Sequence, residues 1–141
     1  MNVPVVVLLG FAAWTLLTLI AGVGVYRWGH ILTRRTSIVD WWADSGQGCD
    51  WYRRATRAHM NCVENLPVYG AIVVALTVAE VRSPLVDGLS VAMLAARIGQ
   101  TLTHVGLPPT DASASLRFAL FFVEMICMIG MGGAAAVAMV K

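Results

Sequence analysis

Three polar residues interrupt a long apolar segment at regular spacing: Arg57, Asn61 and Glu64. The i, i+4, i+7 spacing places all three on one face of an α-helix. A charged side chain inside a membrane helix costs about 2.5–3.5 kcal/mol and usually faces a bundle interior or a watery cavity. Because intramembrane charges are functional by default, this face is a candidate ligand site.

The composition indicates that these residues lie in a membrane. Hydrophobic residues make up 58% of the 141 residues and charged residues 13%, with a mean hydropathy of +0.73. Soluble domains are typically about 45–50% apolar and about 25% charged, and so short a chain cannot hide the excess in a soluble core. The net charge of +2 is too small to indicate a nucleic-acid partner. We therefore predict a single membrane domain over residues 1–141.

Four segments are long and apolar enough to cross a bilayer, which takes about 20 residues. The predicted transmembrane helices cover about residues 3–26, 55–81, 85–107 and 114–140. Backbone polar groups in lipid must be satisfied internally, and the sequence has no alternating pattern of barrel strands. The predicted fold class is therefore all-α, an integral membrane four-helix bundle.

Basic residues are unequally distributed between the connections. The second connection has one arginine, Arg82, whereas the first has five: Arg27, Arg34, Arg35, Arg53 and Arg54. Because basic residues favour the cytoplasmic side, we expect the first and third connections to be cytoplasmic and both termini to face away. No organelle signal is evident, so a bacterial inner membrane is the expected location.

One layer of polar side chains is predicted at the cytoplasmic mouth of the bundle. At about 1.5 Å per residue, Arg57, His104 and Arg117 all lie close to that side, and Arg27 can join them. This layer has a net positive charge. An anionic ligand that enters from the cytosol is therefore expected there.

A second layer, roughly 13–15 Å deep, is predicted to contain Glu64, Arg97 and Glu124. Opposite charges at matched depth can neutralise one another, most simply as Glu64 with Arg97. Such a pair can serve a ligand site, or it can be a packing device that fixes helix register. The sequence leaves both interpretations open.

The segment from Arg57 to Pro67 reads Arg-Ala-His-Met-Asn-Cys-Val-Glu-Asn-Leu-Pro. It resembles the R-A-H-x-N-x-x-E-x-x-P pattern of the membrane-associated proteins in eicosanoid and glutathione metabolism, the MAPEG family. The pattern is specific, since polar residues and a proline recur at fixed spacing inside a membrane helix. Length, four spans, a basic first connection and a third-helix arginine extend the resemblance over nearly the whole chain.

The resemblance implies a homotrimer that binds glutathione between neighbouring protomers near the cytoplasmic end. Arg57, Asn61 and Glu64 match the family residues that hold glutathione, and Arg97 matches the third-helix arginine. Arg117 matches the arginine early in the fourth helix, which is thought to stabilise the glutathione thiolate and is the predicted catalytic residue.

Further contacts to glutathione are expected from Arg97, from His104 and from a first-helix arginine, which can be Arg27, Arg34 or Arg35. Glutathione is the expected co-substrate. The other expected partners are membrane lipids and a hydrophobic small molecule or lipid. No metal site is expected, since cysteines and histidines do not cluster at ligand spacing.

Several positions depart from the family pattern. They are Met60, Gln100, His104, Phe118 and Phe121, and each removes a donor from the expected thiol or peptide site. The leading hypothesis is a glutathione-dependent transferase or peroxidase acting on hydrophobic electrophiles or lipid hydroperoxides. The alternative is a non-catalytic lipid-binding or scaffold protein of the same family, similar to the five-lipoxygenase-activating protein.

Overall fold

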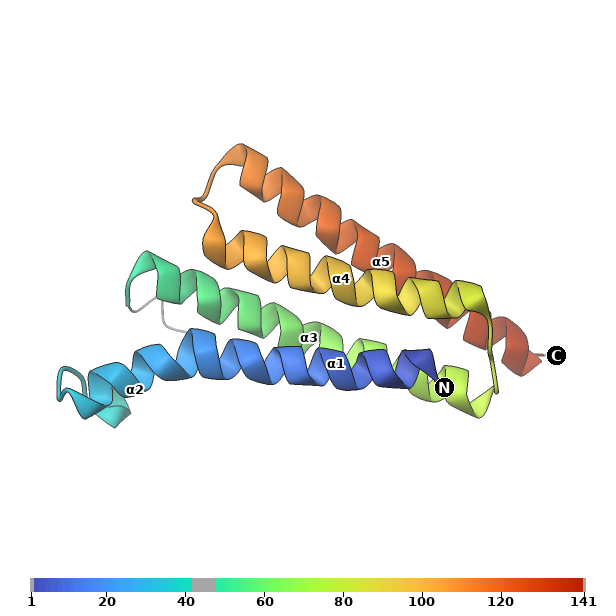
Figure 1. Ribbon diagram of the computed structural model, residues 1–141, viewed down its shortest axis with the longest axis horizontal. Helices are drawn as coiled ribbons and strands as arrows, with labels where there is room; N and C mark the ends of the chain where they lie inside the picture. Colours follow the sequence, from blue (N-terminus) through green and yellow to red (C-terminus); the bar gives the residue numbers. More distant parts are fainter. Residues whose placement is uncertain (1, 42–47, 141) are drawn as a thin grey trace.

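The computed structural model describes residues 2–41 and 48–140, which form four long antiparallel helical rods (Figure 1). The first rod is continuous through three elements, and a short 3-10 turn follows it. In chain order the elements are α1 (Val3–Leu17), the π-helix η1 (Thr18–Gly24), α2 (Val25–Leu32), the 3-10 turn η2 (Ile38–Asp40), α3 (Asp50–Val78), α4 (Pro84–Gly106) and α5 (Asp111–Val140).

All four rods are long and apolar enough to cross a membrane, so the predicted all-α, four-span fold class is confirmed. The boundaries differ from the prediction mainly at the first connection. The first rod continues to Leu32 rather than ending at residue 26, and α3 begins at Asp50 rather than at 55. Hydropathy predicts ends at the limits of the apolar stretch, whereas helical turns with charged residues extend beyond it.

The connection between α2 and α3 and the connection between α4 and α5 lie at the same end of the bundle (Figure 1). Both chain termini and the connection between α3 and α4 lie at the opposite end. We call the first of these the basic end, because Arg34, Arg35, Arg53 and Arg54 are there. Successive membrane spans must alternate in direction, and the arrangement agrees with this requirement.

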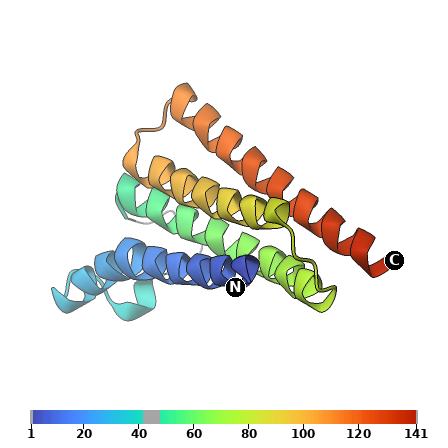
Figure 2. The ribbon, with the colours of Figure 1, turned by 45° about the vertical axis from the view of Figure 1, so that its right-hand side comes forward.

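The helices form two antiparallel pairs that share one core. α4 lies alongside α5, and α1 lies alongside α3, in both views (Figure 2). Phe11, Tyr69, Met93 and Met131 are fully buried between them. The Tyr69 hydroxyl donates a hydrogen bond of 3.2 Å to the Pro4 carbonyl, which ties the start of α1 to α3.

A reciprocal cap fixes the start of α5 and thereby the position of its first arginine. The Thr110 amide donates to the Ser113 hydroxyl (3.0 Å), and the Ser113 amide donates to the Thr110 hydroxyl (3.2 Å). The Ser113 hydroxyl also donates to the Pro108 carbonyl (2.8 Å). Such caps satisfy amides that the first helical turn leaves unpaired. Arg117 follows about one turn later.

The protomer leaves much of its apolar surface open. Its accessible area is 8404 Å², whereas a compact soluble chain of this mass exposes about 7,100 Å². Leu9, Val74, Ile126 and Ile129 are among the large apolar side chains that are more than half exposed. These faces suit contact with lipid tails or with further copies of the chain.

Candidate functional site

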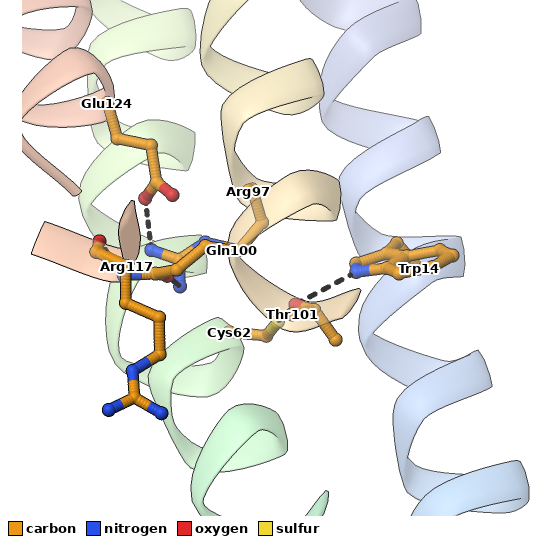
Figure 3. A network of polar contacts seen from close by, with 7 residues as sticks. All are labelled: Trp14, Cys62, Arg97, Gln100, Thr101, Arg117 and Glu124. Atoms are coloured by element: carbon orange, nitrogen blue, oxygen red, sulfur yellow. Dashed lines mark hydrogen bonds and ion pairs between the residues drawn. The ribbon is translucent and has the colours of Figure 1, made fainter. Parts of the chain in front are cut away.

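Among the residues that the structure describes, the largest fully buried side chain is that of an arginine paired between two helices. Arg97 on α4 and Glu124 on α5 are both fully buried, and Arg97 Nη2 donates to Glu124 Oε2 (Figure 3). Arg97 Nη1 also donates to Gln100 Oε1 at 2.6 Å, one helical turn further along α4. The guanidinium carbon lies 5.9 Å from the centre of the Phe11 ring. The positive charge of Arg97 is therefore neutralised and enclosed within a single chain.

This pairing differs from the neutral pair that the sequence predicted for the middle layer. Glu64, predicted as the partner of Arg97, is exposed on α3, and Glu124 takes its place. Depth along the membrane fits either carboxylate, but α4 packs most extensively against α5, which brings Glu124 to Arg97. The structure thus encloses Arg97, whereas the resemblance implied a direct contact with glutathione.

The network continues from Gln100 to the backbone of the predicted catalytic arginine. Gln100 Nε2 donates to the Arg117 carbonyl at 3.4 Å. The Arg117 side chain runs away from the Arg97–Glu124 pair (Figure 3). Gln100 is therefore one link through which the buried pair supports α5 at Arg117. The sequence identified Gln100 only as a departure from the family pattern.

An open cavity of about 340 Å³ lies beside Arg117. Its walls are Gln100, Arg117, Phe118 and Phe121. Phe118 is 65% exposed and Phe121 38% exposed, so both rings are available to an apolar molecule. The cavity combines one cation with two aromatic faces, which suits a polarisable anion next to a flat apolar group.

The three motif residues of α3 face outward from the protomer. Arg57 and Glu64 are exposed and Asn61 is half-buried. Among the described residues, the ion pairs are Arg97 with Glu124 and Asp50 with Arg53, so neither Arg57 nor Glu64 is neutralised that way. A guanidinium, a carboxamide and a carboxylate on one helix face thus lie at the surface of the chain.

A second cavity, of about 260 Å³, joins this face to the end of α4. It is lined by arginines of α3 with Asp50, His104 and Pro109, the arginines being Arg53, Arg54 and Arg57. Arg54, Arg57 and Arg117 all lie close enough to His104 to act on it electrostatically. The structure therefore brings together Arg57 and His104, with Arg117 nearby. Arg53 and Arg54 join them, although the sequence indicated only that both belong to the basic first connection.

Arg27 belongs to a different cluster, at the junction of α2 and α3. Its Nε donates to the Tyr52 hydroxyl at 2.5 Å, and its guanidinium lies 5.5 Å from the Trp41 ring centre. Tyr26 stacks on Tyr52 with ring centres 4.4 Å apart. Arg34 and Arg35 are exposed beyond α2. In this single protomer, the structure does not bring Arg27 to the cavity of Arg57 and His104.

The α2–α3 cluster also explains a glycine. Gly48 has φ +87°, and a Cβ there would lie 2.7 Å from Tyr52 Cδ1. A side chain at this position would therefore strain the backbone and collide with the ring. Glycine lets the chain enter α3 directly over the stacked aromatics.

Four long apolar helices with polar side chains gathered at one end define an integral multi-pass membrane protein. The MAPEG family model matches residues 4–137 of the 141-residue chain. The chain therefore belongs to the MAPEG family, as the Arg57–Pro67 motif predicted. Neither the curated proteins nor the solved structures include a significant match to it.

Proposed function

We propose that this protein is a glutathione-dependent membrane transferase or peroxidase for hydrophobic electrophiles or lipid hydroperoxides. Membership of the MAPEG family supports a role in glutathione-related transfer or in lipid metabolism. The proposal of glutathione dependence rests on one observation. The outward face of α3 with Arg57, Asn61 and Glu64 continues into the arginine-rich cavity beside His104.

The chemistry of this face fits glutathione, which has two carboxylates and one ammonium group. Arg57 offers the planar fork that pairs bidentately with a carboxylate. Glu64 accepts from the ammonium group, and Asn61 can donate to and accept from the peptide. His104 can donate a hydrogen bond to the second carboxylate, and the neighbouring arginines Arg53 and Arg54 add positive charge there.

Arg117 is the residue proposed to act in catalysis. A cation beside the sulfur lowers the pKa of a thiol, and the thiolate is the reactive nucleophile. The thiol proton passes to water, the sulfur forms a bond to the electrophilic carbon, and the leaving group departs with its electron pair. With a lipid hydroperoxide, two glutathione molecules give the alcohol, water and the disulfide. The rings of Phe118 and Phe121 line the cavity where an apolar substrate meets Arg117.

The outward direction of the α3 face supports a homotrimer as the working form. A ligand on Arg57, Asn61 and Glu64 is open to the surface of one protomer, so a neighbouring copy would close over it. We place the site on the cytoplasmic side of a bacterial inner membrane, because the basic end has most of the arginines. In this assembly a first-helix arginine of the neighbour, Arg27, Arg34 or Arg35, would complete the site.

The test uses the purified full chain in lipid nanodiscs. Glutathione is titrated by calorimetry, and conjugation to a generic aromatic chloride is followed by absorbance. We expect both binding and turnover. Arg57→Gln should weaken glutathione binding by about tenfold or more, as expected for a hydrogen bond to a charged group. Arg82→Gln, an exposed arginine at the opposite end, is the matched control and should bind like the wild type.

A second function is favoured by one observation. The Arg117 cavity has aromatic side chains, Phe118 and Phe121, and offers few donors to a reacting group. A lipid-binding or scaffold protein without chemistry would have such a cavity. Glutathione binding without turnover would favour this role, whereas absence of both binding and turnover would contradict the glutathione proposal altogether.

A further inference from the structure

The carboxamide of Gln100 has a single orientation that its neighbours allow. Arg97 Nη1 donates to Gln100 Oε1 at 2.6 Å. A guanidinium has hydrogen-bond donors and no acceptor, so it must meet the oxygen of the carboxamide and not its nitrogen. The NH₂ group of Gln100 is therefore directed away from Arg97. It lies toward α5, where Nε2 donates to the Arg117 carbonyl at 3.4 Å.

The enclosed ion pair holds this orientation in place. Arg97 and Glu124 are both fully buried and paired (Figure 3). The guanidinium cannot turn away from Gln100 without leaving its counterion, and an unpaired buried charge is strongly destabilising. Gln100 is itself only 8% exposed. Its NH₂ group is thus a preorganised donor, which needs no rearrangement when charge develops next to it.

The enclosed network reaches the cavity of Arg117 at this donor. Gln100 lines that cavity of about 340 Å³. A carboxamide nitrogen has two N–H groups, and among the hydrogen bonds of residues 2–41 and 48–140 Nε2 has one acceptor, the Arg117 carbonyl. The second N–H group is left for a molecule in the cavity. The family pattern counts Gln100 among the positions that remove a donor, whereas its geometry supplies one.

The other walls of the cavity define the shape of a substrate. The exposed rings of Phe118 and Phe121 suit a flat apolar body. Arg117 is the cation proposed to stabilise the thiolate, and Gln100 offers a neutral donor beside it. An electrophile that uses all of these groups is flat and has an acceptor oxygen, on which negative charge develops as the sulfur attacks.

We propose that Gln100 is a second catalytic residue and that it selects flat α,β-unsaturated ketones as substrates. This inference rests on the proposed conjugation function and narrows its substrate class. The thiolate sulfur bonds to the β-carbon, the carbon–carbon double bond shifts to the carbonyl carbon, and the carbonyl π electrons move to the oxygen. The Gln100 N–H group binds that oxygen. The enolate then takes a proton from water at its α-carbon, which balances the thiol proton already released, and no group leaves.

The test compares two electrophiles on the full chain in lipid nanodiscs with glutathione. Benzalacetone has a ketone oxygen conjugated to its double bond, whereas benzyl chloride has no acceptor oxygen. We expect the wild type to conjugate both. Gln100→Met has a similar shape and no donor, so the ratio of kcat/KM for benzalacetone to that for benzyl chloride should fall about 10²-fold, as for a lost donor to a developing oxyanion. The ratio is unaffected by a loss that both reactions share.

Two further variants separate the donor from the support that Gln100 gives to Arg97. Gln100→Glu keeps an acceptor for Arg97 but has no N–H group, so the ratio should fall as in Gln100→Met. Gln100→His, as a neutral imidazole, accepts through one nitrogen and donates through the other, so it should recover most of the ratio. Leu102→Met is the matched control, at an exposed position of α4 outside this cavity, and it should behave like the wild type.

Inhibition of the wild type tests the same donor without any variant. Benzylacetone, the saturated ketone, should inhibit conjugation of benzyl chloride about fivefold to tenfold more strongly than butylbenzene at equal mole fraction in the lipid, because only the ketone accepts a hydrogen bond. Equal inhibition by the two compounds would overturn the inference, and so would an unchanged ratio in correctly folded Gln100→Met. Turnover of neither electrophile by the wild type is the distinct result that would contradict the proposed function itself.

Discussion

Two glutamates of this protein have opposite surroundings at similar predicted depths. Glu124 is fully buried between α4 and α5 and pairs with Arg97. Glu64 is exposed on α3, on the same helix face as Arg57 and Asn61. The comparison shows that an intramembrane charge is not by itself evidence of a ligand site. What matters is whether the protomer already supplies the opposite charge.

The same contrast separates the two polar regions as wholes. In the enclosed region, Arg97 donates to both Gln100 and Glu124, and its bond to Glu124 holds α4 to α5. At the basic end, Arg57 and His104 line a cavity with an excess of positive charge. The first region has the character of a structural support and the second that of a binding surface. The following experiments test this division.

The largest effect is expected from breaking the enclosed pair. Glu124→Leu should lower the stability of the folded protomer by about 3–5 kcal/mol, since it leaves the Arg97 charge buried without a counterion. The double variant Arg97→Met with Glu124→Leu should recover most of that loss, because an apolar pair can replace a buried ion pair. Unfolding in detergent, followed by circular dichroism, measures both. A single variant as stable as the wild type would show that the pair does not support the fold.

The next effect tests the chemistry at the basic end. Arg117→Ala should reduce kcat for conjugation by about 10²-fold, the usual size of a lost electrostatic contact to a developing charge. The KM for glutathione should change little, because Arg57, Asn61 and Glu64 are proposed to hold the peptide. Steady-state kinetics with Arg82→Ala as control makes the measurement. Wild-type turnover would remove Arg117 from the proposed mechanism.

A smaller effect distinguishes Glu64 from Glu124. Glu64→Gln should weaken glutathione binding by about tenfold, since it loses the charged acceptor for the ammonium group, and should leave stability almost unchanged. A glutathione analogue without the amine should bind the variant and the wild type equally. Glu80→Gln, exposed near the opposite end, is the control. An equal loss of affinity for glutathione and for the analogue without the amine would contradict the assigned role of Glu64.

The smallest effect concerns Arg27. Tyr52→Phe removes the hydroxyl that accepts from Arg27 Nε, and it should lower stability by about 0.5–1.5 kcal/mol, as for one ordinary hydrogen bond. If Arg27 serves the α2–α3 cluster rather than the ligand, glutathione affinity should stay at the wild-type value. Calorimetry and thermal unfolding of the same preparation separate these effects. A clear fall in glutathione affinity with an unchanged unfolding temperature would show that Arg27 contacts the ligand.

The motif and hydropathy of the sequence predicted the family, the four spans and the polar face of α3. These properties follow from composition and from helical periodicity, which relate residues a few positions apart. The same reasoning predicted that Arg57 and His104 lie near each other, because both are close to the same end of antiparallel helices. Helix ends were predicted less well, because α2 contains Arg27 and His30 and the first turn of α3 contains Asp50 and Arg53, and hydropathy places a boundary at charged residues.

The amino-acid sequence by itself thus determined that charged residues lie within the apolar spans and at what level along each helix. Only the tertiary structure decided which charges meet. Arg97 has two carboxylates at its level, and the packing of α4 against α5 selects Glu124 and leaves Glu64 outside. Depth is a property of one helix, whereas the rotation of each helix and its choice of neighbour depend on contacts among all four. The cavity of about 240 Å³ between η1, α3 and α4 arises in the same way, since Ala21 and Gly22 of η1 enclose a space only once α3 and α4 are packed around them.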